Sequence, residues 1–141
     1  TIEAWVKGAP GQPDESTIIA KGTGSDGTTA NEQFGIDLAL GNYRFFTRGS
    51  ANTIYSAEAA FGPDGTWQHV AGVYDQSNPE QPQMRIYVNG ELQNSAGGRP
   101  LSNGGLRESS SPVSIGSKRL GNAPNPLVLR RELALGRGPV F

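Results

Sequence analysis

The stretch GTWQHVAGVYD (residues 65–75) alternates strictly between two sets of side chains. One set is Trp67, His69, Ala71 and Val73, and the other is Gln68, Val70, Gly72 and Tyr74. Successive side chains of an extended chain point to opposite faces, so this period of two predicts a long β-strand.

The only histidine of the chain, His69, lies in this strand beside Trp67 and ahead of Asp75. At about 3.3 Å per residue, Asp75 lies about 20 Å along the strand from His69, too far for a His–Asp catalytic pair. We therefore interpret His69 as a half-buried structural residue. We expect both tryptophans, Trp5 and Trp67, to pack between two sheets, as large aromatic residues usually do.

On both sides of this stretch, the same alternation and the intervening Gly and Pro residues divide the chain into short strands. We predict strands or hairpins at 1–7, 17–21, 34–40, 43–48, 53–58, 66–75, 84–93 and 112–116. Gly41-Asn42 and Asn89-Gly90 are predicted as two-residue hairpin turns. No stretch has the 3.6-residue period and the caps of a helix. The fold class predicted is an all-β, antiparallel β-sandwich of jelly-roll type.

The composition of the chain excludes several classes of function. The 141 residues suit one domain, and the net charge of −1 supplies no basic stripe for nucleic acid or a membrane surface. No apolar run is long enough to insert in a membrane. The absence of cysteine excludes disulfides, thiolate zinc sites and a cysteine nucleophile.

Several motifs, in order, resemble the laminin G-like, concanavalin A-like jelly-roll family over roughly residues 1–119. They are TIEAWVK (1–7), TIIAKG (17–22), FGIDLAL (34–40) with YRFF (43–46), GTWQHVAGVYD (65–75), MRIYVNGEL (84–92) and VSIGS (113–117). The resemblance implies a β-sandwich of the concanavalin A type.

The chain departs from that family pattern at both ends. The family has strands before its TIEAW-like strand, so we interpret residues 1–141 as a single domain truncated at the N-terminus. Residues 120–141 form an atypical tail, because NPLVLRRELALGRGPVF (125–141) does not match the family's closing Phe-x-Gly-x-x-Asp-Glu-Val strand. Two explanations of this tail stay open: a natural variant, or the product of a shifted reading frame.

Catalysis is disfavoured by the spacing of the acidic residues. Glycoside hydrolases of this fold place carboxylates on one strand as Glu-x-Asp-x-x-Glu or Glu-x-Asp-x-Glu, and retaining chemistry needs two of them about 5–5.5 Å apart. The strand carboxylates Glu3, Asp37 and Asp75 stand singly, and Asp14-Glu15 falls in a loop. We predict that the protein is not an enzyme.

Calcium is the metal that the chain suits best. The polar run GSDGTTANE (24–32) offers oxygen ligands from Asp26, Asn31 and Glu32. Related jelly-roll domains often carry a calcium ion at the rim. The alternative is a solvated loop without metal.

Ligand-binding residues are expected on the central hairpin, in the sheet that would form a concave face. The candidates are Tyr43, Arg44, Phe46, Arg48, Asn52 and Tyr55. Arg44, Phe46 and Arg48 share one side of their strand by alternation.

We therefore expect a noncatalytic recognition module of a larger secreted or cell-surface protein. It would bind a glycan or an extracellular protein through rim loops or the concave sheet. The alternatives are a purely structural spacer in an adhesin-like chain and the accessory lectin domain of a glycoside hydrolase or sialidase.

Overall fold

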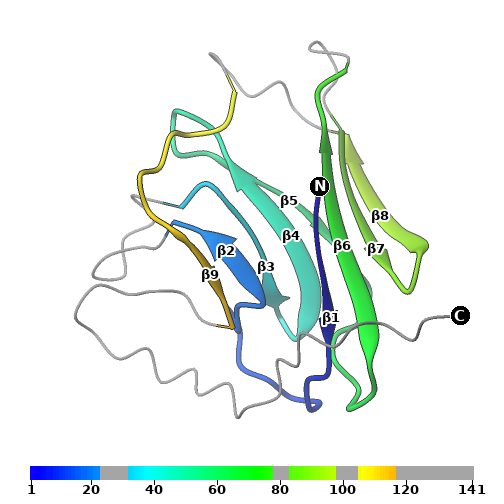
Figure 1. The fold of residues 1–141 in the computed structure, drawn as a ribbon. Coiled ribbons are helices and arrows are strands. Elements are labelled where there is room, and N and C mark those ends of the chain that lie inside the picture. The colour runs from blue at the N-terminus through cyan, green and yellow to red at the C-terminus, as the bar shows by residue number, and fades with distance from the viewer. Residues whose placement is uncertain (23–31, 78–82, 98–104, 117–141) are drawn as a thin grey trace, which may run out of the picture.

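The computed structural model describes residues 1–22, 32–77, 83–97 and 105–116. These residues form two antiparallel sheets and no helix, which confirms the predicted fold class (Figure 1). No segment of these ranges is therefore a helix long and apolar enough to cross a membrane.

Within the described ranges, nine strands make up the two sheets. The strands are β1 (Ile2–Val6), β2 (Ile19–Lys21), β3 (Phe34–Ala39), β4 (Asn42–Arg48), β5 (Ile54–Glu58), β6 (Gln68–Asp75), β7 (Gln83–Val88), β8 (Glu91–Gly97) and β9 (Val113–Ile115). The four-stranded sheet has the order β1-β6-β7-β8, and the five-stranded sheet has the order β5-β4-β3-β2-β9. Strands far apart in sequence, such as β1 and β6, are therefore neighbours.

The core lies between the two sheets. Its buried side chains come from alternate positions of the strands, including Ile36, Phe45, Val70 and Ile86. Contacts between the sheets join β4 and β5 with β6, β7 and β8. Gly72 lets the sheets approach at one point, because a Cβ there would lie 2.3 Å from the Phe45 ring.

The central hairpin turns one residue earlier than predicted. Ala39 pairs with Asn42, and Leu40 and Gly41 occupy the turn with φ of 51° and 80°. Two positive φ angles are those of a type I′ turn, which Gly41 adopts easily. Leu40 is therefore 86% exposed instead of on the apolar face of β3. The predicted turn at Asn89-Gly90 is confirmed, with φ of 53° and 82°.

The expected packing of the tryptophans between the sheets is wrong. Trp5 and Trp67 are each 41% exposed. On β6, the core-facing side chains are those of Gln68, Val70 and Gly72, whereas His69 faces outward opposite Trp5. The alternation is as predicted, but its inner and outer faces are exchanged.

Candidate functional site

Strand β4 presents Arg44, Phe46 and Arg48 on the outer face of the five-stranded sheet, as the alternation predicted. Tyr43 and Phe45, which alternate with these residues, belong to the core cluster, whereas Phe46 does not. The Arg44 guanidinium lies over the Phe46 ring, 5.4 Å from its centre, in a cation–π contact. Arg44 is the most accessible of the three side chains, because Phe46 and Arg48 are 1% and 9% exposed.

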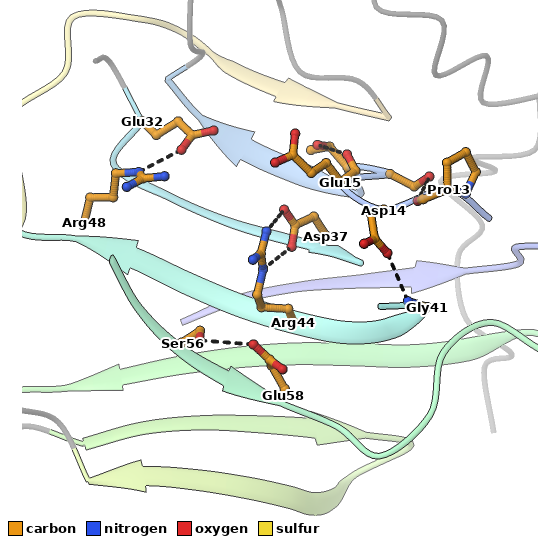
Figure 2. A network of polar contacts seen from close by, with 12 residues as sticks. Pro13, Asp14, Glu15, Glu32, Asp37, Gly41, Arg44, Arg48, Ser56 and Glu58 are labelled. Carbon is orange, nitrogen blue, oxygen red and sulfur yellow. Dashed lines mark hydrogen bonds and ion pairs between the residues drawn. The ribbon is translucent and has the colours of Figure 1, made fainter. Parts of the chain in front are cut away.

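Arg44 is the centre of a charged row that crosses three strands (Figure 2). Cross-strand pairing places it between Asp37 on β3 and Glu58 on β5. Its Nε and Nη2 donate to the two Asp37 carboxylate oxygens at 2.8 and 2.7 Å. These hydrogen bonds raise the pKa of Arg44, against the opposing effect of burial. A planar, two-bond pair of this kind is rigid.

Phe46 lies between Arg44 and Arg48 on β4, and its neighbours on the adjacent strands are small residues. Its cross-strand partners are Ser56 on β5 and Gly35 on β3, and Gly35 in turn pairs with Ala20 on β2. A Cβ on Gly35 would lie 2.9 Å from the Phe46 ring, so the ring rests directly on the glycine. Phe46 itself is only 1% exposed, which leaves little of the ring for a ligand.

At one end of this sheet, Arg48 joins a polar network at the rim. Its Nε donates to the Glu32 carboxylate at 2.8 Å (Figure 2). Its Nη1 donates to the Asn52 carbonyl at 3.3 Å. Arg107 Nη1 donates to the Asn52 side-chain oxygen at 2.8 Å. Gln33 Nε2 donates to the Arg107 carbonyl at 2.6 Å. These bonds fix four separate chain segments relative to one another.

The same rim contains a hollow of about 420 Å³. It is lined by Lys21, Gln33, Glu108, Ser109 and Ser110. Each of these described residues carries a polar side chain: an ammonium, an amide, a carboxylate and two hydroxyls. This volume falls in the usual range of small-ligand pockets, and the mixture offers both donors and acceptors.

Two of the six predicted ligand-binding residues lie on the wrong side of the sheet. Tyr43 is completely buried, and its hydroxyl donates to Gln68 Oε1 at 2.7 Å. Burial raises its pKa, and the Asp64 charge adds to this effect. Tyr55 pairs with Thr47 and packs against the core. Both tyrosines alternate with the outward residues, so neither reaches the outer face. Arg44, Phe46 and Arg48 lie there, and Asn52 lies at the rim, 4 positions beyond Arg48 in a turn.

The predicted calcium ligands are only partly described. Asp26 and Asn31 lie outside the described residues. Glu32 is 4% exposed, and its carboxylate accepts the hydrogen bond from Arg48. Within the described ranges, no group of three or more His, Cys, Asp or Glu side chains is placed to hold a metal ion. The calcium prediction therefore depends on Asp26 and Asn31.

The comparison with protein families agrees with this architecture. A family model for laminin G domains, described as the concanavalin A-like lectin/glucanases superfamily, matches residues 1–127. The chain belongs to this superfamily. The match ends within the stretch that the sequence marked as an atypical tail, and that stretch lies outside the described residues. A search of curated proteins found no match.

Sequence reasoning missed the residues that line the rim hollow. Lys21 ends β2, Gln33 precedes β3, and 108–110 precede β9, so they lie far apart in a chain with many polar loop residues. In a concanavalin A-like sandwich, strand pairing alone brings these segments together. The only local signal was the polar character of each segment.

Proposed function

We propose that this domain is a noncatalytic glycan-recognition module and that the rim hollow is its glycan site. The observation that carries the proposal is the set of polar side chains among the described lining residues, Lys21, Gln33, Glu108, Ser109 and Ser110. A sugar presents many hydroxyls, each both donor and acceptor, and this lining offers partners of both kinds. Membership of the concanavalin A-like lectin/glucanase superfamily supports the same class of ligand.

The rim network supports binding by reducing its entropic cost. Gln33 is held by the Arg107 carbonyl, and Arg107 is held by the Arg48 carbonyl and Asn52. A lining that is already ordered loses less side-chain freedom when a ligand arrives. Gln33 is therefore already positioned when a ligand arrives.

The carboxylates support a noncatalytic role. Glu108 is the one carboxylate among the described lining residues, whereas glycoside hydrolysis by a retaining mechanism uses two. On the adjacent sheet face, Asp37 and Glu32 form ion pairs with arginines. An ion-paired carboxylate is a poor acid or nucleophile at neutral pH.

We further propose that the parent protein is secreted or exposed at the cell surface, where laminin G-like domains typically occur. Its partner there would be a glycan or a glycosylated protein. Calcium bound through Asp26 and Asn31 would add to the rim site, and this part of the proposal is tested separately by chelation.

The test is a glycan array followed by calorimetry on the best ligand. We expect Gln33→Ala and Glu108→Ala to weaken binding about 10- to 100-fold, from the loss of about 1.5–3 kcal/mol per hydrogen bond to a charged or well-placed group. Arg85→Ala, on the other sheet, is the matched control and should bind normally. Loss of binding in chelator would assign calcium to the site. Absence of binding to any glycan would overturn the proposal in favour of a structural spacer.

A further inference from the structure

The outer face of the four-stranded sheet carries aromatic side chains with no packing role in the core. Trp5 on β1 pairs with His69 on β6, and Tyr87 on β7 pairs with Ala71 on β6 and Leu92 on β8. Trp5 is 41% and Leu92 52% exposed. We call Trp5, His69, Ala71, Tyr87 and Leu92 the aromatic face.

The aromatic rings of this face have a small side chain next to them. Ala71 lies between Glu3 and Tyr87, in the row next to that of Trp5 and His69, and its small side chain is 7% exposed. The rings of Trp5 and His69 are tilted by 51°, with centroids 5.3 Å apart. Trp67 lies immediately before β6 and two residues before His69, so it points to the same side of the chain. It is also 41% exposed. Both tryptophans of the chain are thus accessible to solvent at this sheet.

Polar groups are interleaved with the rings. The Glu3 carboxylate lies 3.7 Å from His69 Nε2, and its side chain is 65% exposed. The backbone around His69 is held by the turn between β7 and β8, because the His69 N–H donates to Asn89 Oδ1 at 2.9 Å and the Asn89 N–H donates to the His69 carbonyl at 2.7 Å. The face therefore places an imidazole and a carboxylate next to Trp5, with the His69 backbone held in place.

We propose that the aromatic face binds a neutral, extended polysaccharide. Its sugar rings stack their apolar C–H faces on Trp5 and Tyr87, and their hydroxyls bond to Glu3 and His69. Separate rings with polar groups between them suit such a ligand, which alternates apolar faces with hydroxyls. A protein partner would instead favour a core depleted of charge. This site lies on the sheet opposite the rim hollow and does not depend on it.

The spacing of the rings sets the length of the ligand. Trp5 and Tyr87 are two strands apart and offset along the strands, a separation of about 12 Å by standard strand spacing and rise. This distance exceeds a single sugar ring. Binding is therefore expected to require an oligosaccharide, and a monosaccharide should bind far more weakly.

The experiment uses tryptophan emission as its readout. The chain has two tryptophans, so Trp67→Phe leaves Trp5 as the only one. In this background, cellohexaose, xylohexaose and mannohexaose are titrated alongside glucose, xylose and mannose. We expect at least one hexaose to shift the Trp5 emission and to protect it from acrylamide quenching, and its monosaccharide to do neither at the same concentration.

Variants then assign the site. In the otherwise unchanged chain, Trp5→Ala or Tyr87→Ala should weaken binding of that hexaose at least 10-fold by calorimetry. Glu108→Ala, which alters the rim hollow, should leave it unchanged, so failure at one site is distinguishable from failure at the other. Melting curves identify any variant that loses its fold, and Leu92→Asp then serves as the second test because Leu92 is the most exposed member of the aromatic face.

Three outcomes would overturn the proposal. The first is that none of the hexaoses perturbs Trp5. The second is that binding survives Trp5→Ala and Tyr87→Ala in folded protein. The third is self-association that Trp5→Ala abolishes, measured by sedimentation, which would assign the aromatic face to a second copy of the chain instead.

Discussion

The Tyr43 hydroxyl donates a 2.7 Å hydrogen bond to the Gln68 side-chain oxygen across the interior of the sandwich. It links β4 of one sheet to β6 of the other, between two side chains that are 0% and 4% exposed. This bond places two polar groups in the core, and each satisfies the other.

Removing one partner should cost more than removing both. Tyr43→Phe leaves Gln68 buried without its donor, and we expect the free energy of unfolding to fall by about 1–3 kcal/mol. In the double variant Tyr43→Phe with Gln68→Leu, no orphaned group remains, so most of that loss should be recovered. Urea unfolding of the two single variants and the double variant measures the coupling. Strictly additive effects would contradict a direct bond.

Tyr43 should also produce an alkaline dependence of stability. Its folded-state pKa is raised by burial, whereas the unfolded chain ionises near the usual value of about 10. The neutral phenol is favoured in the folded state, so this stability is complete below pH 10 and declines as the pH rises above it. Thermal melting between pH 8 and 11.5 should show this decline in the wild type and a smaller one in Tyr43→Phe. Equal slopes would refute the assignment.

The ion pair of Arg44 and Asp37 gives a third prediction. The Asp37 side chain is fully buried, so Arg44→Gln removes the charge that compensates it. We expect a loss toward the low end of about 3–5 kcal/mol, because Arg44 is partly accessible. Arg85→Gln breaks the more exposed pair with Asp75 and should cost less than about 1 kcal/mol. Similar costs for the two variants in urea unfolding would contradict the role of burial.

Gly72 tests the contact between the two sheets. Gly72→Ala would place a methyl group against the Phe45 ring, and overpacking of this kind costs about 1–3 kcal/mol. Phe45→Leu in the same chain should relieve the clash, so the double variant should be more stable than the sum of the two single effects. Calorimetric melting of the three variants measures this. If Gly72→Ala melts like the wild type, the sheets are farther apart than the structure shows.

The sequence alone predicted most of the strands and the fold class. The period of two in 34–40 and 66–75 is local, and so is the Asn89-Gly90 turn, whose residues tolerate positive φ. Local signals also placed Arg44, Phe46 and Arg48 on one side of β4. Each of these features depends on neighbours along the chain, which is why a single sequence contains them.

Only the tertiary structure decided which side of each strand is covered. Alternation separates Tyr43 from Arg44 and Trp5 from Ala4, but it does not say which faces the other sheet. That choice depends on how whole sheets stack, and it buried Tyr43 while exposing both tryptophans. Likewise, the rim hollow exists because pairing of β2 with β3 and β9 assembles distant polar segments. Local patterns define the strands, whereas burial is a property of the assembled sandwich.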